Sequence, residues 1–351
     1  MTQDTPKEPS FLILDAAQKK PVSRPPVWLM RQAGRYMPEF RAIRAKVDFL
    51  TLCDTPDLVV EVSMQPVDQL GVDGAIIFSD LLIPSRDMGS DLEYVKGEGP
   101  VIHNPIRHAD DVKKLKRPDP SEASPSLGKA IGLLKKQVEP RIPVLGFTGA
   151  PWTTAAYMVE GGGSRNYIHM KTMMYKDPAL FAQLLDHIAE VLVDYLAYQV
   201  ESGARLVQIF DSWAGALSLA DYRQYALSAT QKVIREFKQR CPNTPLTLYV
   251  GNSGHLLEAT AESGADILSL DWRVDLRDAI QRVGDKVSFQ GNLDPVRLFS
   301  SEEDVVEQVQ QILDTCPWKT GHIFNLGHGI LPLTPVSNVK RLVETVQAHR
   351  Y

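Results

Sequence analysis

Two arginines four residues apart, Arg31 and Arg35, have a spacing that suggests binding chemistry. One helical turn would place both guanidinium groups on one face, and these planar forks match carboxylates and phosphates. Gly34 lies between them and has no Cβ, so backbone or ligand can come close there. The alternative is a solvated basic turn whose arginines pair with nearby acids. The aromatic and methionine residues within positions 30–41 disfavour it, because a solvated turn has little use for them.

The composition limits the class of protein. The 351 residues include 38 Lys and Arg against 43 Asp and Glu, a formal charge of -5, which does not suggest a nucleic-acid partner. No apolar run approaches the roughly 20 residues of a membrane span, and residues 1–10 lack the features of a signal or transit peptide. The three cysteines are widely spaced and odd in number, which fits a reducing compartment. We expect a soluble, cytoplasmic protein.

Eight short apolar or β-branched runs alternate with longer segments of helical period. The runs are Val27–Met30, Gly74–Phe78, Pro143–Phe147, Leu206–Phe210, Leu246–Val250, Ile267–Leu270, Val287–Gln290 and Ile323–Leu326. Buried strands separated by helices indicate a parallel sheet, and eight such units closing on themselves form a (β/α)8 TIM barrel. The competing doubly wound sheet usually has fewer strands, and no Gly-x-Gly-x-x-Gly follows the first run. We therefore predict an α/β fold, a (β/α)8 TIM barrel.

The pattern also predicts the domain organisation. Residues 1–25 form an N-terminal tail and short helix, and residues 26–351 form a single barrel domain. Residues 84–120, which contain several glycines and prolines, are expected to be an extended loop region after the second strand. Residues 118–126 are expected to be a loop and not a domain boundary.

Chemistry in such a barrel gathers at the carboxyl ends of the strands. Each predicted strand here is followed by polar, hydroxyl-bearing or small residues, which a purely structural barrel would not need at all eight ends. The candidates at or after these ends are Arg31, Asp80, Tyr157, Ser212 and His328. Simpler roles stay open, as helix caps for Ser212 and for Asp80, Asp211 and Asp271, and as a core side chain for Tyr157.

Metal and nucleophile chemistry have little support in the sequence. His255, His322 and His328 are near strand ends, but no His-x-x-x-His or Cys-x-x-Cys pair accompanies them. Gly-x-Ser-x-Gly, the nucleophile motif of hydrolases, is absent.

Five blocks of the sequence closely resemble the uroporphyrinogen decarboxylase family. They are Met30–Tyr36 with Pro38–Arg41, Ile76–Asp80, Gly149–Thr153 with Tyr157–Ser164, Gln290–Pro295, and Asn325–Gly329. The resemblance runs from about residue 26 to the C-terminus. It implies a (β/α)8 barrel, a homodimer with facing clefts, and no cofactor or metal. The implied reaction removes CO2 from the four acetate side chains of uroporphyrinogen III and gives coproporphyrinogen III on the haem and chlorophyll route.

The resemblance also implies which residues act. Substrate binding falls on ten positions: Arg31, Gln32, Ala33, Gly34, Arg35, Arg44, Asp80, Tyr157, Ser212 and His328. Asp80 and Arg31 are the expected catalytic residues. An acceptor-only carboxylate such as Asp80 suits the centre of a ring with four inward pyrrole N–H donors. A pyrrole protonated beside the acetate is a cation that can take up the electrons left by CO2, and a central anion would stabilise it. Arg31 is the favoured proton donor, although guanidinium is a poor acid unless perturbed.

Two other functions compete. A cobalamin-dependent methyltransferase-like barrel would hold zinc through His-x-Cys and a distant Cys, but the matching segment here is Gly254-His255-Leu256, with no Cys at the needed spacing. A non-catalytic tetrapyrrole carrier would bind uroporphyrinogen without releasing CO2.

Overall fold

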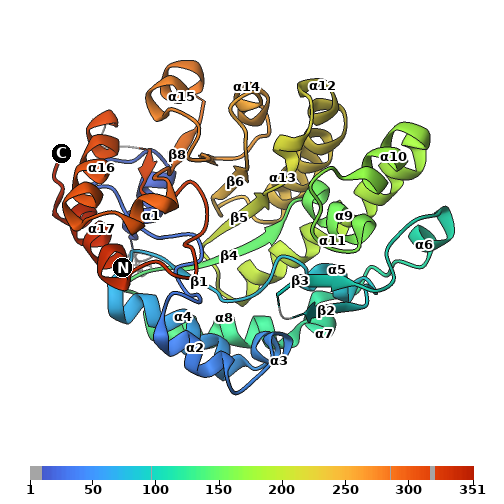
Figure 1. Ribbon diagram of the computed structural model, residues 1–351, viewed down its shortest axis with the longest axis horizontal. Coiled ribbons are helices and arrows are strands. Elements are labelled where there is room, and N and C mark those ends of the chain that lie inside the picture. Colours follow the sequence, from blue (N-terminus) through green and yellow to red (C-terminus); the bar gives the residue numbers. More distant parts are fainter. Residues whose placement is uncertain (1–9, 96, 285, 317–320) are drawn as a thin grey trace, which may run out of the picture.

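The computed structural model describes residues 10–95, 97–284, 286–316 and 321–351. Seven parallel strands form one curled sheet in the order β1-β4-β5-β6-β7-β8-β9, with helices outside it (Figure 1). The strands are β1 (Ala75–Ile76), β4 (Val144–Gly149), β5 (Leu206–Asp211), β6 (Leu246–Val250), β7 (Ile267–Ser269), β8 (Ser288–Gln290) and β9 (His322–Ile323). Together with the barrel-shaped structures that resemble it, described below, this confirms the α/β barrel prediction.

The first predicted strand closes the ring with a single bridge. Val27 pairs in parallel with Phe324, just after β9. On its other side, the Asp73 N–H donates to the Val27 carbonyl over 2.7 Å, just before β1. The Arg24 guanidinium and the Asp73 carboxylate form an ion pair of 2.7 Å beside this junction. The strand is short because Pro25 and Pro26 have no N–H to donate, and a tight turn begins soon after Val27.

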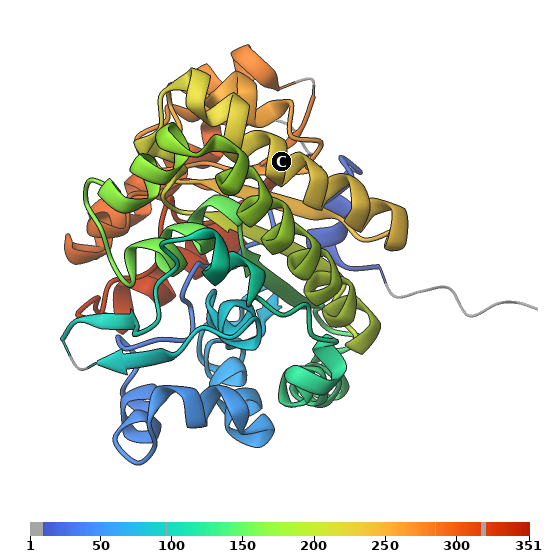
Figure 2. The same cartoon turned by 90° about the vertical axis from the view of Figure 1, so that its right-hand side faces the viewer.

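The larger helices surround the sheet (Figures 1 and 2). They are α4 (Pro56–Leu70), α8 (Pro125–Val138), α9 (Pro151–Glu160), α10 (Ile168–Lys176), α11 (Pro178–Ser202), α13 (Ser228–Arg240), α15 (Leu276–Val283), α16 (Glu302–Thr315) and α17 (Val336–Ala348). The shorter ones are α1 (Leu12–Ala17), α2 (Pro38–Arg44), α3 (Phe49–Asp54), α5 (Ile83–Asp87), α6 (Ala109–Lys113), α7 (Pro120–Ala123), α12 (Leu219–Asp221) and α14 (Leu257–Ala261). The 3-10 helices η1 (Ala214–Ala216) and η3 (Pro295–Phe299) and the π-helix η2 (Tyr222–Leu227) complete the set.

The inside of the barrel combines apolar packing with a buried polar layer. Trp28 donates its indole N–H to the Gln290 side chain over 2.9 Å. Gln290 in turn donates to Gln208 over 3.0 Å and to Ser269 over 2.9 Å. These bonds join side chains of three strands to the closing segment, so they fix the position of the backbone that leads to Arg31.

The N-terminal helix α1 belongs to the same core. Phe11, Ile13 and Ala16 are buried in one cluster with Leu145 and Leu206 of the barrel. The predicted tail, residues 1–9, lies outside the described residues, and the division at residue 25 stays a prediction.

The segment expected to be an extended loop contains regular structure. An antiparallel hairpin, β2 (Leu92–Val95) with β3 (Gly99–Ile102), follows α5. The Ile102 N–H donates to the Gly161 carbonyl over 2.9 Å, which ties this hairpin to the end of α9. Residues 118–126, also predicted to be a loop, hold α7 and the start of α8. No helix in the described part of the chain is long and apolar enough to cross a membrane.

Candidate functional site

The arginine segment is a turn, and the single helical turn expected for Arg31 and Arg35 is wrong. Arg31 has φ 62, in the left-handed region, and the next helix, α2, begins only at Pro38. A left-handed residue cannot continue a right-handed helix, so the two arginines do not share a helix face. The Arg31 side chain instead packs on Gly329, where an added Cβ would lie 2.4 Å from its Cδ. Gly329 is thus a glycine because Arg31 occupies the space beside it.

Gln32 is fully buried and its side chain is used within the protein. Its Oε1 accepts the Leu29 N–H over 3.0 Å, and its Nε2 donates to the Gly74 carbonyl over 3.0 Å. The Gln32 carbonyl accepts the Tyr36 hydroxyl over 2.7 Å. The amide therefore joins the closing segment to the start of β1. Ala33 and Gly34, which follow it, are half-buried.

Arg35 and Arg44 differ in how their charges are used. Arg35 is exposed, and its guanidinium makes no hydrogen bond or ion pair within the described ranges. Arg44 is half-buried, donates to the Val47 carbonyl and lies 5.6 Å from the Phe49 ring centre. The charges of Arg44 and Asp80 both act on Cys53, and the charge of Arg31 acts on Asp80.

Asp80 follows β1 and is half-buried. Burial raises the pKa of its carboxyl, while Tyr94, the Leu82 N–H and the charge of Arg31 lower it. The Leu82 N–H donates to Oδ1 over 2.9 Å. The Tyr94 hydroxyl, carried by β2, is close enough to act on this pKa but falls short of a well-formed hydrogen bond. Asp80 therefore has free acceptor capacity in a partly desolvated position.

Tyr157, on α9, is half-buried and stacks on Trp213 with ring centres 4.0 Å apart. Burial and the charge of Asp80 raise the pKa of its phenol, and Arg31 lowers it. The hydroxyl therefore stays protonated and can donate. Ser212 precedes Trp213 at the end of β5 and is half-buried.

His328 is half-buried between two glycines. Its Nδ1 accepts the Gly329 N–H over 2.7 Å, so in the neutral ring the proton is on Nε2. Burial and the nearby charge of Arg31 lower its pKa to about 4. The ring is therefore neutral at pH 7 and offers one N–H donor.

Taken together, the electrostatic effects bring four of the predicted residues into one group. Arg31 acts on the pKa of Asp80, Tyr157 and His328. The Gln32 side chain is bound to the backbone beside this group, and the Arg44 side chain donates to the Val47 carbonyl. The side-chain hydroxyl of Ser212 has no contact that joins it to the group within the part of the chain that the structure describes.

The helix-cap alternatives do not fit the geometry. The helices that follow Asp80, Asp211 with Ser212, and Asp271 have Leu82, Trp213 and Asp275 at their N-caps. Asp271 accepts N–H groups from Arg273 and Asn252. Asp211 accepts the Thr153 hydroxyl over 2.7 Å.

Sequence reasoning missed three contributors. Tyr94 reaches Asp80 from the unpredicted hairpin, although the glycines at positions 97 and 99 were a usable hairpin signal. Trp213 stacks on Tyr157, and Tyr249 lies edge-on to His328 with ring centres 6.2 Å apart. Nothing in the local sequence marks these two ring contacts, because their partners lie far away in the chain.

Metal ligands do not gather here. No group of three or more His, Cys, Asp or Glu that could hold a metal ion occurs among residues 10–95, 97–284, 286–316 and 321–351. His255, the residue that the zinc alternative would use, is bound to the Leu217 carbonyl over 2.9 Å.

The known sequences that are similar to this chain belong to one family. The family model described as "Uroporphyrinogen decarboxylase (URO-D)" matches residues 8–349. The uroporphyrinogen decarboxylase of Chloroflexus aurantiacus (strain ATCC 29366 / DSM 635 / J-10-fl) is 48% identical over 338 residues, 96% of this chain and 95% of that protein. The one from Geobacter metallireducens is 46% identical over 333 residues, 95% of this chain and 97% of that protein.

Solved structures show the same fold at lower sequence identity. A methyltransferase from Methanosarcina mazei has a TM-score of 0.82 and 21% identity, covering 96% of this chain and 99% of that one. A B12-independent methionine synthase from Shewanella sp. W3-18-1 has a TM-score of 0.54 and 12% identity, covering 86% and 90%. At these identities the likeness concerns the fold alone.

Proposed function

This chain belongs to the uroporphyrinogen decarboxylase family and has that carboxy-lyase activity in tetrapyrrole biosynthesis, and from this premise we propose that Asp80 and Arg31 are its catalytic residues. The observation that carries the proposal is the position of Asp80. It is a half-buried carboxylate with free acceptor capacity, in a group whose other members, Arg31, Tyr157 and His328, are donors.

This arrangement complements the substrate's charge pattern. Uroporphyrinogen has carboxylates on its rim and pyrrole N–H donors at its centre. Arg31, Arg35 and the Nε2–H of His328 would bind rim carboxylates, and Tyr157 would donate from the side. Ala33 and Gly34 would line the site through their backbone. Gln32 would hold the turn in place, and Ser212 and Arg44 would act at the edge, Arg44 after releasing Val47.

Asp80 would act on both binding and chemistry. Pyrrole N–H donors favour its ionised form and so oppose the effect of burial. When a pyrrole is protonated beside the acetate, the anion at the centre stabilises the cation that takes up the electrons of the breaking C–C bond. Arg31 would supply the proton that the pyrrole carbon accepts, and the Asp80 anion would stabilise the cation that this transfer forms.

We also propose a homodimer with facing sites, located in the cytoplasm. The family resemblance supports the dimer, and the free state of Cys53, Cys241 and Cys316 is consistent with a reducing compartment. Sedimentation of the purified chain tests the first point, since a single species of monomer mass would contradict it.

Replacing Asp80 tests the catalytic proposal. Asp80→Asn keeps an oxygen for the Leu82 N–H but removes the charge and adds an NH2 that faces the pyrrole donors. We expect kcat/KM for uroporphyrinogen to fall by about 10²-fold or more. Asp80→Glu, which keeps the charge, should retain some activity. Thermal unfolding of both should stay near that of the wild type, and a nearly fully active Asp80→Asn enzyme would show that Asp80 is not catalytic.

A further inference from the structure

A further cationic side chain lies beside His328. The turn after β7 packs directly on the glycine that precedes this histidine, because a Cβ added to Gly327 would lie 2.1 Å from the backbone nitrogen of Trp272. Arg273 is the next residue of that turn, and its charge acts on the pKa of His328 and of Tyr249. Arg273 therefore belongs to the open end of the barrel, where the strands have their carboxyl ends. It is outside the ten positions that the resemblance assigns to the substrate.

The guanidinium of Arg273 is held on two sides. Its Cζ lies 3.9 Å from the centre of the Trp272 ring, so one face of the guanidinium is stacked. Its Nη1 donates to both carboxylate oxygens of Asp271 over 3.1 Å, and the Asp271 side chain is only 2% exposed. Asp271 also accepts the N–H groups of Asn252 and Arg273. A buried anion and an aromatic ring thus restrict a long side chain, which reduces the entropy lost when a ligand binds.

The stacked guanidinium has donors to spare. Its Nε and Nη2 make no hydrogen bond within the part of the chain that the structure describes, and the side chain is 51% exposed. Nε and Nη2 form the side-on fork of a guanidinium, whose two parallel N–H groups match the two oxygens of a carboxylate. Arg273 is therefore able to pair with Asp271 and with a second carboxylate at the same time.

The position of Arg273 indicates which substrate carboxylate it would meet. The charge of Arg31 acts on both Asp80 and His328, whereas that of Arg273 acts at the His328 end. The reaction proposed above takes place at Asp80. A guanidinium that pairs with a carboxylate stabilises its charge and so opposes its loss as CO2. An ion pair at the other end of the site suits a carboxylate that stays on the product.

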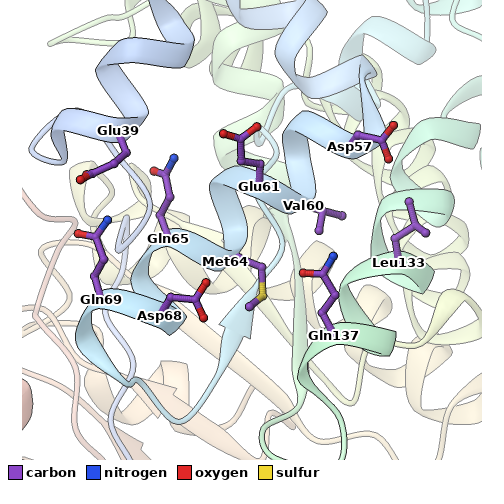
Figure 3. A pocket seen from close by; sticks show the side chains of 10 residues that line it. All are labelled: Glu39, Asp57, Val60, Glu61, Met64, Gln65, Asp68, Gln69, Leu133 and Gln137. Carbon is purple, nitrogen blue, oxygen red and sulfur yellow. The ribbon is translucent and has the colours of Figure 1, made fainter.

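The groove on the outer helices does not suit an anionic ligand. It runs over α4 and α8 and is completed by α2, and Figure 3 shows its side chains. Its lining includes Glu39, Asp57, Glu61 and Asp68, and none of the described residues that line it is basic. Carboxylates are repelled from such a surface. The rim of the substrate is better matched by cations at the carboxyl ends of the strands, such as Arg273.

We propose that Arg273 is a further substrate-binding residue, whose Nε and Nη2 bind a carboxylate that uroporphyrinogen keeps when it becomes coproporphyrinogen. This role rests on the site proposed above. The substrate and the transition state carry the same carboxylate at this position, so Arg273 lowers KM and contributes little to kcat. The product carries it as well, so Arg273 strengthens the binding of coproporphyrinogen by a similar factor.

Anaerobic steady-state kinetics of Arg273→Ala and Arg273→Lys test the proposal. Arg273→Ala should raise KM for uroporphyrinogen about ten-fold and keep kcat within about two-fold of the wild type. The inhibition constant of added coproporphyrinogen should rise by a similar factor. Arg273→Lys keeps a cation for Asp271 but has no planar fork. It should unfold at the wild-type temperature and still raise KM several-fold.

Two further variants serve as controls. Arg240→Ala removes another exposed arginine that is paired with an acid, Asp194, but it ends α13 shortly before β6 begins, at the opposite end of the barrel. It should leave KM unchanged. Asp80→Asn, measured in the same assay, should lose kcat. If it does not, the proposed catalytic site fails, and this result is distinct from any change of KM in the Arg273 variants.

Three results would overturn the role of Arg273. A wild-type KM in Arg273→Lys would show that the residue serves only to pair with Asp271. A loss of kcat at unchanged KM in Arg273→Ala would place its effect in the chemical step. A raised KM with unchanged inhibition by coproporphyrinogen would mean that Arg273 meets a carboxylate that the reaction removes.

Discussion

From one position Arg31 acts on four other ionisable groups, those of Asp80, Tyr157, Tyr249 and His328. Its charge lowers the pKa values of Asp80, Tyr157 and His328. It opposes the effect of burial on Asp80 and Tyr157 and adds to the effect of burial on His328. The result is one acceptor, Asp80, surrounded by donors whose protonation does not change near pH 7. A polyanionic substrate with central donors meets fixed partners, which reduces reorganisation during the reaction.

Arg35 should contribute to affinity and little to folding. Its guanidinium is exposed and makes no bond to the described parts of the chain, so Arg35→Ala removes a binding group without leaving a buried partner unpaired. We expect substrate binding to weaken ten-fold or more, about 1.4 kcal/mol. The thermal midpoint should hardly move, and the wild-type affinity should fall as salt rises. Lys46→Ala, which removes one exposed charge beyond α2, is the control and should bind normally. A destabilised Arg35→Ala enzyme with normal affinity would contradict this role.

Asp211 should make stability depend on pH. It is buried, and burial raises its pKa to about 7, while the Thr153 hydrogen bond opposes this effect. The folded state therefore holds this proton in a range where the unfolded state has lost it. Its contribution makes stability fall as pH rises from about 4 to about 7, by roughly 1.4 kcal/mol for each pH unit crossed.

Asp211→Asn removes that ionisation and keeps an oxygen for Thr153. Relative to the wild type, the variant should gain a few kcal/mol of unfolding free energy between pH 5 and pH 8, measured by urea denaturation. The exposed Asp314→Asn serves as the control and should show no such gain. If the difference between Asp211→Asn and the wild type is the same at both pH values, Asp211 ionises normally and its burial has no such effect.

At the scale of the elements, the segment that closes the barrel at Val27 also carries the turn with Arg31. Val27 closes the sheet, and Gln32, five residues later, binds the Leu29 N–H and the Gly74 carbonyl. The turn that carries Arg31 is therefore held on both sides by β1 and by the segment after β9. The role of Gln32 in substrate binding stays a prediction, and its side chain holds this backbone.

Replacing Gln32 separates the two roles. Gln32→Leu leaves a buried N–H and a buried carbonyl without partners, so we expect a loss of about 2–5 kcal/mol in unfolding free energy. Gln310→Leu on the exposed side of α16 is the control and should change stability little. A variant of unchanged stability with weaker substrate binding would restore the substrate-contact role.

Sequence periodicity was sufficient for the barrel but not for the local turns. Seven of the eight apolar runs overlap a strand of the sheet, and the first contributes a single bridge at Val27, because buried parallel strands read as continuous apolar runs. The hairpin of β2 and β3 was not predicted, because its strands are only four residues long and the surrounding prolines favour a loop, although the glycines at positions 97 and 99 also fit a hairpin turn. Spacing alone does not reveal the arginine turn, because two of its contacts, the Arg31 side chain on Gly329 and the Met30 N–H on Asn325, are with residues late in the chain. The motif resemblance predicted Asp80 and His328 as site residues. The aromatic residues beside them, Tyr94 and Tyr249, are brought there by tertiary packing and were not predicted.

At the scale of the whole molecule, the fold says little about the reaction. The Methanosarcina methyltransferase has nearly the same backbone at 21% identity. What distinguishes this chain is its relatives at 44–48% identity and the side chains at the strand ends. Function therefore depends on a small number of residues placed on a widely shared scaffold.

Decarboxylation by this enzyme should need no added cofactor or metal ion. The protonated pyrrole of the substrate can itself take up the electrons of the broken bond. Dialysis against a strong chelator should therefore leave kcat unchanged when uroporphyrinogen is assayed anaerobically. A purified carrier of tetrapyrroles would release no CO2 in the same assay. Loss of activity on chelation that zinc restores would show that the chemistry depends on a metal.

The closing segment also has a consequence for biosynthesis. The Met30 N–H is bound by the side chain of Asn325, 295 residues later in the chain, over 2.9 Å. A ribosome adds about 5–20 residues per second, so roughly 15–60 s pass between the synthesis of the Arg31 turn and the synthesis of the segment that completes it. During that time a nascent chain already contains the arginines but has no ordered site for a tetrapyrrole. Because the last strand completes the site, a chain that stalls before β9 cannot capture and hold the substrate.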